Sequence, residues 1–126
     1  MSVKFNVVAK KNPQDLTAAP KWYASAVGDG ETTLKDLAEY ASKTSTVSKA
    51  DILAVLETTL TKVSIDLSNG KIVKVGEYFT LQMSLSSEGS ATEAEVTSSK
   101  VKGAKINFRP GKMLKDMIKL ATFSKK

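Results

Sequence analysis

The chain has 126 residues, of which 41% are hydrophobic and 25% charged, and its net charge at pH 7 is +6. This length and balance are typical of one folded domain and not of a disordered chain. The sequence contains no Cys and no His, which excludes disulfides, thiolate nucleophiles, Cys-based zinc sites and every catalytic pair that needs a histidine.

Two alternating runs near the start of the chain predict two strands. Val3, Phe5 and Val7 alternate with polar residues, and a second run of this kind covers residues 22–26. Period-two alternation is typical of half-buried strands. The segment between the runs contains two prolines, and because proline lacks an amide donor it favours a loop there.

Two helices are predicted next. The first covers about residues 33–42, with its leucines and alanines on one face. The second has the clearest start, because Ser48 can cap its first amides, and Asn69–Gly70 is a good C-cap. Its apolar stripe over residues 52–67 is broad, as in a helix buried on more than one side. In so short a chain this stripe predicts a homodimer.

Three further strands and a third helix complete the expected order. A short strand is predicted at residues 72–75 and two alternating strands at residues 81–85 and 105–109. Residues 86–103 are polar, so we expect the last two strands to continue outward as a ribbon, the arm. The final helix follows Pro110–Gly111, and its inward-facing side chains are predicted to be Met113, Leu114, Met117 and Ile118. This order indicates an α+β fold.

The charge is uneven along the chain. Residues 76–99 contain four Glu and no base, whereas residues 100–126 contain nine bases and one Asp. A basic segment beside an acidic one favours a polyanion bound on one face, although a solvated tail would fit this charge alone equally well. Lys105 and Arg109 fall on the strand face opposite Ile106 and Phe108, so phosphate contact and core packing need not compete there.

The start of the last helix is typical of an anion site. We expect exposed amides around Gly111, with Lys112 beside them, to bind phosphate. Lys115 and Lys119, at i and i+4, extend this basic stripe. The other interpretation is an ordinary solvated helix face.

Two segments, Asn69–Gly76 and Phe108–Asp116, resemble the bacterial HU and integration-host-factor family. The resemblance implies an HU-like core at residues 33–122, with two N-terminal helices, an antiparallel three-stranded sheet, the arm at residues 86–103 and a C-terminal helix. Residues 1–30 look like the extra N-terminal hairpin of a longer HU-like variant. We therefore expect a single HU-like domain over residues 1–126.

The resemblance implies a homodimer that binds double-stranded DNA largely without sequence specificity and has an architectural role in the nucleoid. The expected DNA-binding residues are Lys71, Lys74, Lys100, Lys102, Lys105, Arg109, Gly111, Lys112, Lys115 and Lys119. We predict no enzymatic activity, catalytic residue, cofactor, metal site or small-molecule substrate. No apolar run reaches the roughly 20 residues of a membrane helix and the first residues lack a signal peptide's apolar core, so a cytoplasmic protein without membrane contact is expected.

Two other functions stay open at this point. An HU-fold dimer could serve as a protein-interaction module with weak or no DNA binding, which an acidic arm would suit. A hydrolase that uses carboxylates alone is a distant alternative. The arm also lacks the family's Arg-Asn-Pro tip, since no proline lies between Pro20 and Pro110, and its acidic residues would be repelled by phosphates. We therefore expect only modest bending of DNA.

Overall fold

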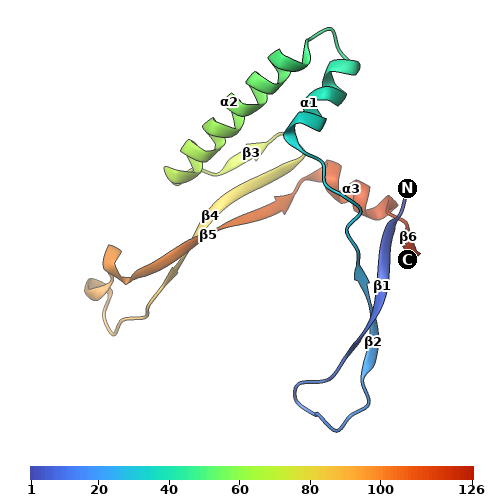
Figure 1. Cartoon of the computed structure of the whole chain (residues 1–126). Helices are drawn as coiled ribbons and strands as arrows, with labels where there is room; N and C mark the ends of the chain where they lie inside the picture. The colour runs from blue at the N-terminus through green and yellow to red at the C-terminus, as the bar shows by residue number, and fades with distance from the viewer. The chain divides into compact units, whose positions relative to one another are not determined.

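The computed structural model describes residues 1–126, which form two compact units. The terminal unit combines residues 1–33 with residues 117–126, and the central unit comprises residues 34–116. Together they contain three α-helices and two three-stranded sheets (Figure 1). The predicted α+β class is therefore confirmed.

The terminal unit is built on the two strands expected near the start of the chain. Strands β1 (Val3–Lys10) and β2 (Lys21–Ala26) pair antiparallel as a hairpin. A third strand, β6 (Phe123–Lys125), which we did not predict, pairs parallel to β1 and makes the strand order β2-β1-β6. The predicted hairpin is thus part of a three-stranded sheet.

Hydrogen bonds outside the strand ladder also fasten the two ends of the chain together. The Val3 amide donates to the Thr122 carbonyl at 2.8 Å. The hydroxyls of Ser2 and Ser124 lie 2.7 Å apart. These contacts tie β6 to β1 although almost the whole chain separates them.

The central unit begins with two helices, α1 (Leu34–Lys43) and α2 (Lys49–Ser68). As predicted, the Ser48 hydroxyl accepts the Asp51 amide at 3.2 Å at the start of α2. Gly70, with φ +79°, follows the end of this helix. The left-handed backbone there favours glycine, because other residues would be strained in it.

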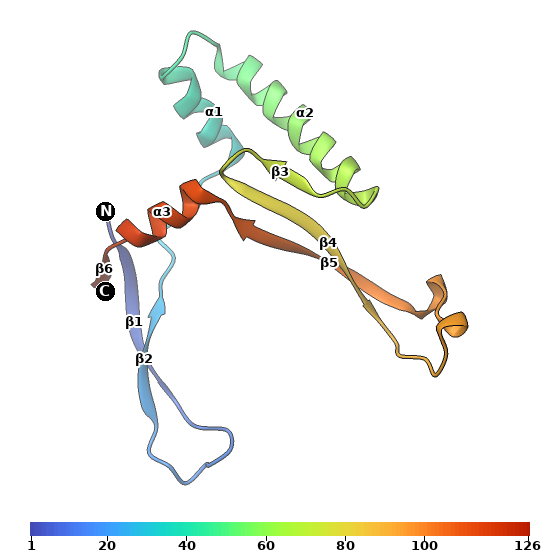
Figure 2. The same ribbon diagram turned by 180° about the vertical axis from the view of Figure 1, so that it is seen from behind.

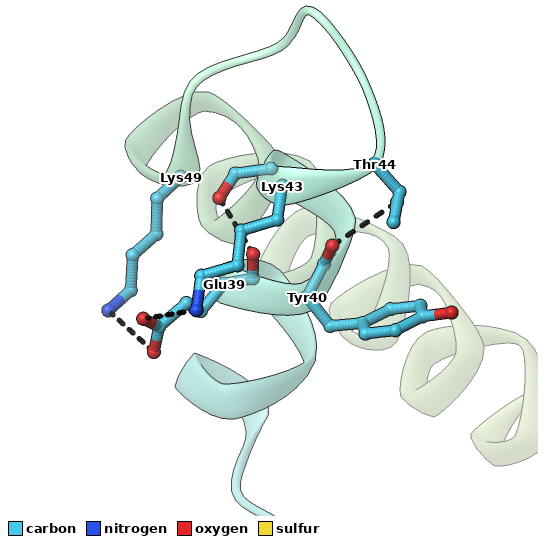
Figure 3. Close-up of polar contacts among 6 residues, drawn as sticks. Glu39, Tyr40, Lys43, Thr44 and Lys49 are labelled. Carbon is cyan, nitrogen blue, oxygen red and sulfur yellow. Dashed lines mark hydrogen bonds and ion pairs between the residues drawn. The ribbon is translucent and has the colours of Figure 1, made fainter.

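The connection between α1 and α2 is held by exposed polar contacts (Figure 3). The Glu39 carboxylate lies 3.4 Å from the Lys43 ammonium and 4.0 Å from that of Lys49. The Thr44 hydroxyl donates to the Tyr40 carbonyl at 3.2 Å. Exposed ion pairs of this kind contribute little to stability, so this corner depends mainly on the packing of α1 against α2.

The sheet of the central unit has the strand order β3-β4-β5 and is antiparallel throughout. Its strands are β3 (Val73–Val75), β4 (Phe79–Ser87) and β5 (Val101–Pro110). Apolar residues share one face, on which the rings of Phe79 and Phe108 lie 5.6 Å apart. The alternation that predicted these strands therefore also gave the correct apolar face.

The arm is the outer part of the β4–β5 ribbon (Figure 2). The strands end at Ser87 and resume at Val101, and the tip contains two short 3-10 turns, η1 (Glu93–Glu95) and η2 (Ser98–Lys100). The Glu88 amide donates to the Lys100 carbonyl at 2.9 Å and closes the tip. Its acidic side chains, Glu88, Glu93 and Glu95, are all exposed.

A large apolar surface remains uncovered within the single chain. Only Ala38 and Leu67 are buried. On the apolar face of the central sheet, Leu85, Ile106 and Phe108 are 66%, 49% and 55% exposed.

The last helix, α3 (Lys112–Leu120), corrects one prediction. Met113, Met117 and Ile118 are each about half exposed rather than inward-facing, and only Leu114 is partly covered. The spacing of apolar residues identified the helix, but its apolar stripe is only partly covered. No helix in the chain combines the length and apolarity needed to cross a membrane.

Candidate nucleic-acid interface

Three predicted bases share the polar face of the central sheet. The strand register places Lys74 beside Thr80, and Thr80 beside Arg109, in one row across β3, β4 and β5. Lys105 occupies the same face further along β5, opposite Ser84. All three basic side chains are exposed, so cations can reach an anion without disturbing the apolar face.

Sequence reasoning missed the neutral polar groups between these bases. Gln82 and Asn107 are cross-strand partners midway between the Arg109 and Lys105 rows. The Ser84 hydroxyl is buried and has no hydrogen-bond partner. Amide side chains commonly donate to phosphates in protein–DNA interfaces, whereas a hydroxyl as buried as that of Ser84 cannot reach one. The sequence does indicate this polar face, since Gln82, Ser84 and Asn107 alternate with Leu81, Met83 and Ile106.

The start of α3 is clamped to the turn between β3 and β4. The Gly111 amide donates to the Tyr78 carbonyl at 2.6 Å, and the Met113 amide to the Glu77 carbonyl at 3.1 Å. Our prediction of free amides around Gly111 is therefore wrong for these two groups. The clamp instead holds the backbone between Arg109 and Lys112 against the turn, while both side chains stay exposed.

Close packing explains why residue 111 is a glycine. A Cβ atom there would overlap the Glu77 carbonyl oxygen and lie 2.8 Å from the carbonyl carbon of Tyr78. We expect Gly111→Ala to lower the free energy of unfolding by about 3 kcal/mol, because backbone atoms must shift and the clamp hydrogen bonds are strained. Urea unfolding followed by circular dichroism measures this change.

Gly103→Ala is the matched control, because a Cβ atom at Gly103 meets nothing within 4 Å. That variant should differ from the parent chain by no more than about 1 kcal/mol. Equal effects of the two substitutions would show that the clamp does not limit stability.

The remaining bases differ in how they relate to this surface. Lys112 and Lys115 lie on the part of α3 within the central unit, whereas Lys119 belongs to the terminal unit. Asp116 follows Lys112 at i+4 and so shares its side of the helix, which reduces the local positive charge. Lys71 precedes β3, and its amide donates to the Asp66 carbonyl at 3.0 Å at the end of α2.

Two of the expected DNA-binding residues, Lys100 and Lys102, are not grouped with Lys105. Lys102 falls at a bulge, because the register passes from the Ser86–Gly103 pair to the Ser87–Val101 pair. Bulges redirect side chains, and the Lys102 ammonium lies 3.8 Å from the Glu88 carboxylate. Lys100 ends η2 and is half-buried.

Most bases of the sheet and of α3, Lys102 excepted, have no acidic partner in the observed ion pairs. The four pairs use Lys43, Lys49, Lys62 and Lys102. Lys74, Lys105, Arg109, Lys112 and Lys115 take part in none of them. No group of three or more acidic side chains is arranged to hold a metal ion. We call these five bases with Gln82 and Asn107 the central interface.

Comparison with known proteins identifies a family and solved structures of similar fold. The profile of the family described as "HU domain fused to wHTH, Ig, or Glycine-rich motif" matches residues 1–125. No curated protein matches the chain. A crystal structure of a protein from Bacteroides vulgatus ATCC 8482, described as a candidate bacterial DNA-binding protein, has a similar fold, with a TM-score of 0.69 and 14% identity. The match covers 98% of this chain and 48% of that protein, so the chain spans about half of its length.

Proposed function

Because the chain belongs to the family of HU domains fused to a wHTH, Ig or glycine-rich motif, we propose that it is a non-enzymatic architectural protein of the nucleoid that binds double-stranded DNA. The observation that carries this proposal is the gathering of Lys74, Lys105 and Arg109 on one sheet face. The clamp at Gly111 adds Lys112 and Lys115 from the start of α3.

The chemistry of the central interface suits phosphates better than base edges. Four of its five cations are lysines, which act as point charges and bind phosphate without reading sequence. Such contacts release counterions and provide most of non-specific DNA affinity. Binding of duplex DNA largely without sequence preference follows.

We propose further that the binding form is a homodimer. The apolar face of the central sheet is uncovered, since Leu85, Ile106 and Phe108 are 66%, 49% and 55% exposed, and obligate homodimers bury 2,000 Å² or more in total. Exposed apolar residues lie on the central sheet and along α2, where a groove of about 680 Å³ includes Val55, Val63 and Val75. A second copy of the chain is the occupant that provides apolar surface of matching size.

The affinity for a short random duplex, measured by fluorescence anisotropy across a salt series, tests the proposed function. If phosphate contacts dominate, log K falls linearly with log salt, with a slope between about −4.5 and −9 for five to ten contacts. A protein-interaction module would instead bind the duplex weakly at every salt concentration, and that result would overturn the proposal.

The acidic arm leads to a separate prediction about DNA bending. Glu88, Glu93 and Glu95 are exposed at the tip, and phosphates on both walls of the minor groove would repel them. We expect the arm tip to stay out of the groove, so that bending is modest.

Energy transfer between dyes on the two ends of a duplex of about 35 base pairs measures the bend. The end-to-end distance should stay near that of free DNA and should not change when residues 88–98 are trimmed to a tight turn. A large shortening that disappears on trimming would show that the arm wedges into DNA.

A further inference from the structure

The hairpin of the terminal unit carries cations that the central interface does not use. Lys10 and Lys21 are direct cross-strand partners in the β1–β2 register, and both are exposed. Like charges directly opposite each other destabilise a strand pair. Neither lysine takes part in the observed ion pairs. The hairpin therefore holds an uncompensated pair of positive charges.

The acid nearest in sequence does not relieve this repulsion. Asp15, in the loop between the strands, accepts hydrogen bonds from the Thr17 hydroxyl at 2.6 Å and from the Thr17 amide at 3.0 Å. These hydrogen bonds lower the pKa of Asp15 below its ordinary value, so it stays charged but is held within its own turn. Residues 10–23 contain three lysines and this one acid.

Strand alternation gives the hairpin a polar face that includes an aromatic ring. Lys10, Lys21 and Tyr23 lie on one side of the sheet, whereas Phe5 and Trp22 lie on the other. The Lys10 ammonium is 5.7 Å from the centre of the Tyr23 ring, a distance that suits a cation–π contact. This contact holds Lys10 on the polar face.

A hollow of about 650 Å³ opens at this end of the hairpin and is lined by Lys10, Lys11, Lys21 and Tyr23, together with loop residues. In Figure 2 the loop lies at the end of β1 and β2 farthest from the N-terminus. The three ammonium groups and the Tyr23 hydroxyl are all donors, so the hollow offers donors to an anion from several sides.

We propose that these four residues, the hairpin lysine face, bind the phosphodiester backbone of DNA as a contact separate from the central interface. The proposal rests on the proposed function for the identity of its ligand. A phosphate placed between Lys10 and Lys21 would attract both ammonium groups and so offset their repulsion. Because the hollow is open, it suits a continuous backbone better than a small enclosed anion.

The single tryptophan of the chain makes a local test possible. Trp22 is adjacent to Tyr23 but lies on the opposite face. In the variant Trp22→Phe/Tyr23→Trp the only indole lies on the hairpin lysine face. Titration with a dye-labelled duplex then reports contact at the hairpin by indole emission and total binding by dye anisotropy. We expect the emission at position 23 to change on saturation, and to change more than that of Trp22 in the parent chain.

Charge variants in the Trp22→Phe/Tyr23→Trp background link that emission change to the lysines. Lys10→Glu places opposite charges across the strands, which favours the hairpin, so unfolding is not expected to confuse the result. Lys10→Glu should raise about tenfold the DNA concentration at which half of the indole emission change has occurred. The variant loses one phosphate contact and adds repulsion. Lys125→Glu is the matched control, because Lys125 pairs beside Phe5 on the other face. It should leave the indole titration unchanged.

The outcomes separate this proposal from the proposed function. An emission change that persists in Lys112→Glu/Lys115→Glu supports an independent hairpin contact. Bound DNA with no change in the indole emission overturns the hairpin proposal and leaves the proposed function intact. Absence of DNA binding at low salt overturns both. An emission response to polyglutamate but not to the duplex would assign the face to an acidic protein partner, and the proposal would fail.

Discussion

The double variant Lys112→Glu/Lys115→Glu is expected to bind a random duplex about a hundredfold more weakly than the parent chain at physiological salt. Each lysine lost removes one phosphate contact, and each glutamate adds repulsion. The slope of log K against log salt should become shallower by about two for each protomer that contacts the duplex. Anisotropy titrations across a salt series measure both quantities.

The fold should survive this double change, because both side chains are exposed and the clamp uses only backbone groups of Gly111 and Met113. Lys35→Glu/Lys43→Glu, on α1, is the matched control with the same change in net charge. If the two double variants lose affinity equally, the effect is one of overall charge and the central interface has been misplaced.

Dimer formation is expected to fail in Ile106→Glu. Ile106 is 49% exposed on the apolar face of the central sheet, so the isolated chain would tolerate a glutamate there. In a homodimer that covers this face, two copies each lose about 2 kcal/mol of apolar burial and each buries a charge. The dissociation constant of the dimer should therefore rise at least about a thousandfold, which corresponds to about 4 kcal/mol. Sedimentation of dilute protein measures the change.

Asn107→Glu provides the control, because Asn107 is the next residue along β5 and faces the polar side with Gln82. The dimer should persist in that variant. A parent chain that sediments as a stable, folded monomer would refute the homodimer directly, and the exposed apolar face would then need another partner.

Local signals explain which parts of the fold could be predicted from the sequence. The bounds of α2 follow from Ser48 and Gly70, each of which acts on backbone groups within a few residues. The faces of β4 and β5 follow from strict alternation, which places Lys105 and Arg109 together without knowledge of the register. Charge placed along an alternating strand is therefore a dependable guide to which basic side chains share a sheet face.

The features that were missed depend on contacts distant in the sequence. Strand β6 has three residues and is defined only by its pairing with β1. The amide of Gly111 is engaged because the β3–β4 turn packs against it, which no local pattern reveals. Lys102 is separated from Lys105 by a bulge whose position depends on the partner strand. The exposure of Met113 and Met117 reflects a surface that the chain alone does not cover.

The parallel pairing of β1 with β6 also has a consequence for the order of folding. Ser2 and Ser124, whose hydroxyls meet beside these strands, are 122 positions apart in the sequence. On a ribosome, β1 is synthesised before β6 and must wait for the whole segment between them before this ladder can close. The β1–β2 hairpin and the central sheet have much lower contact order and can form sooner. Loop-closure entropy grows only with the logarithm of loop length, so the long separation delays this ladder more than it weakens it.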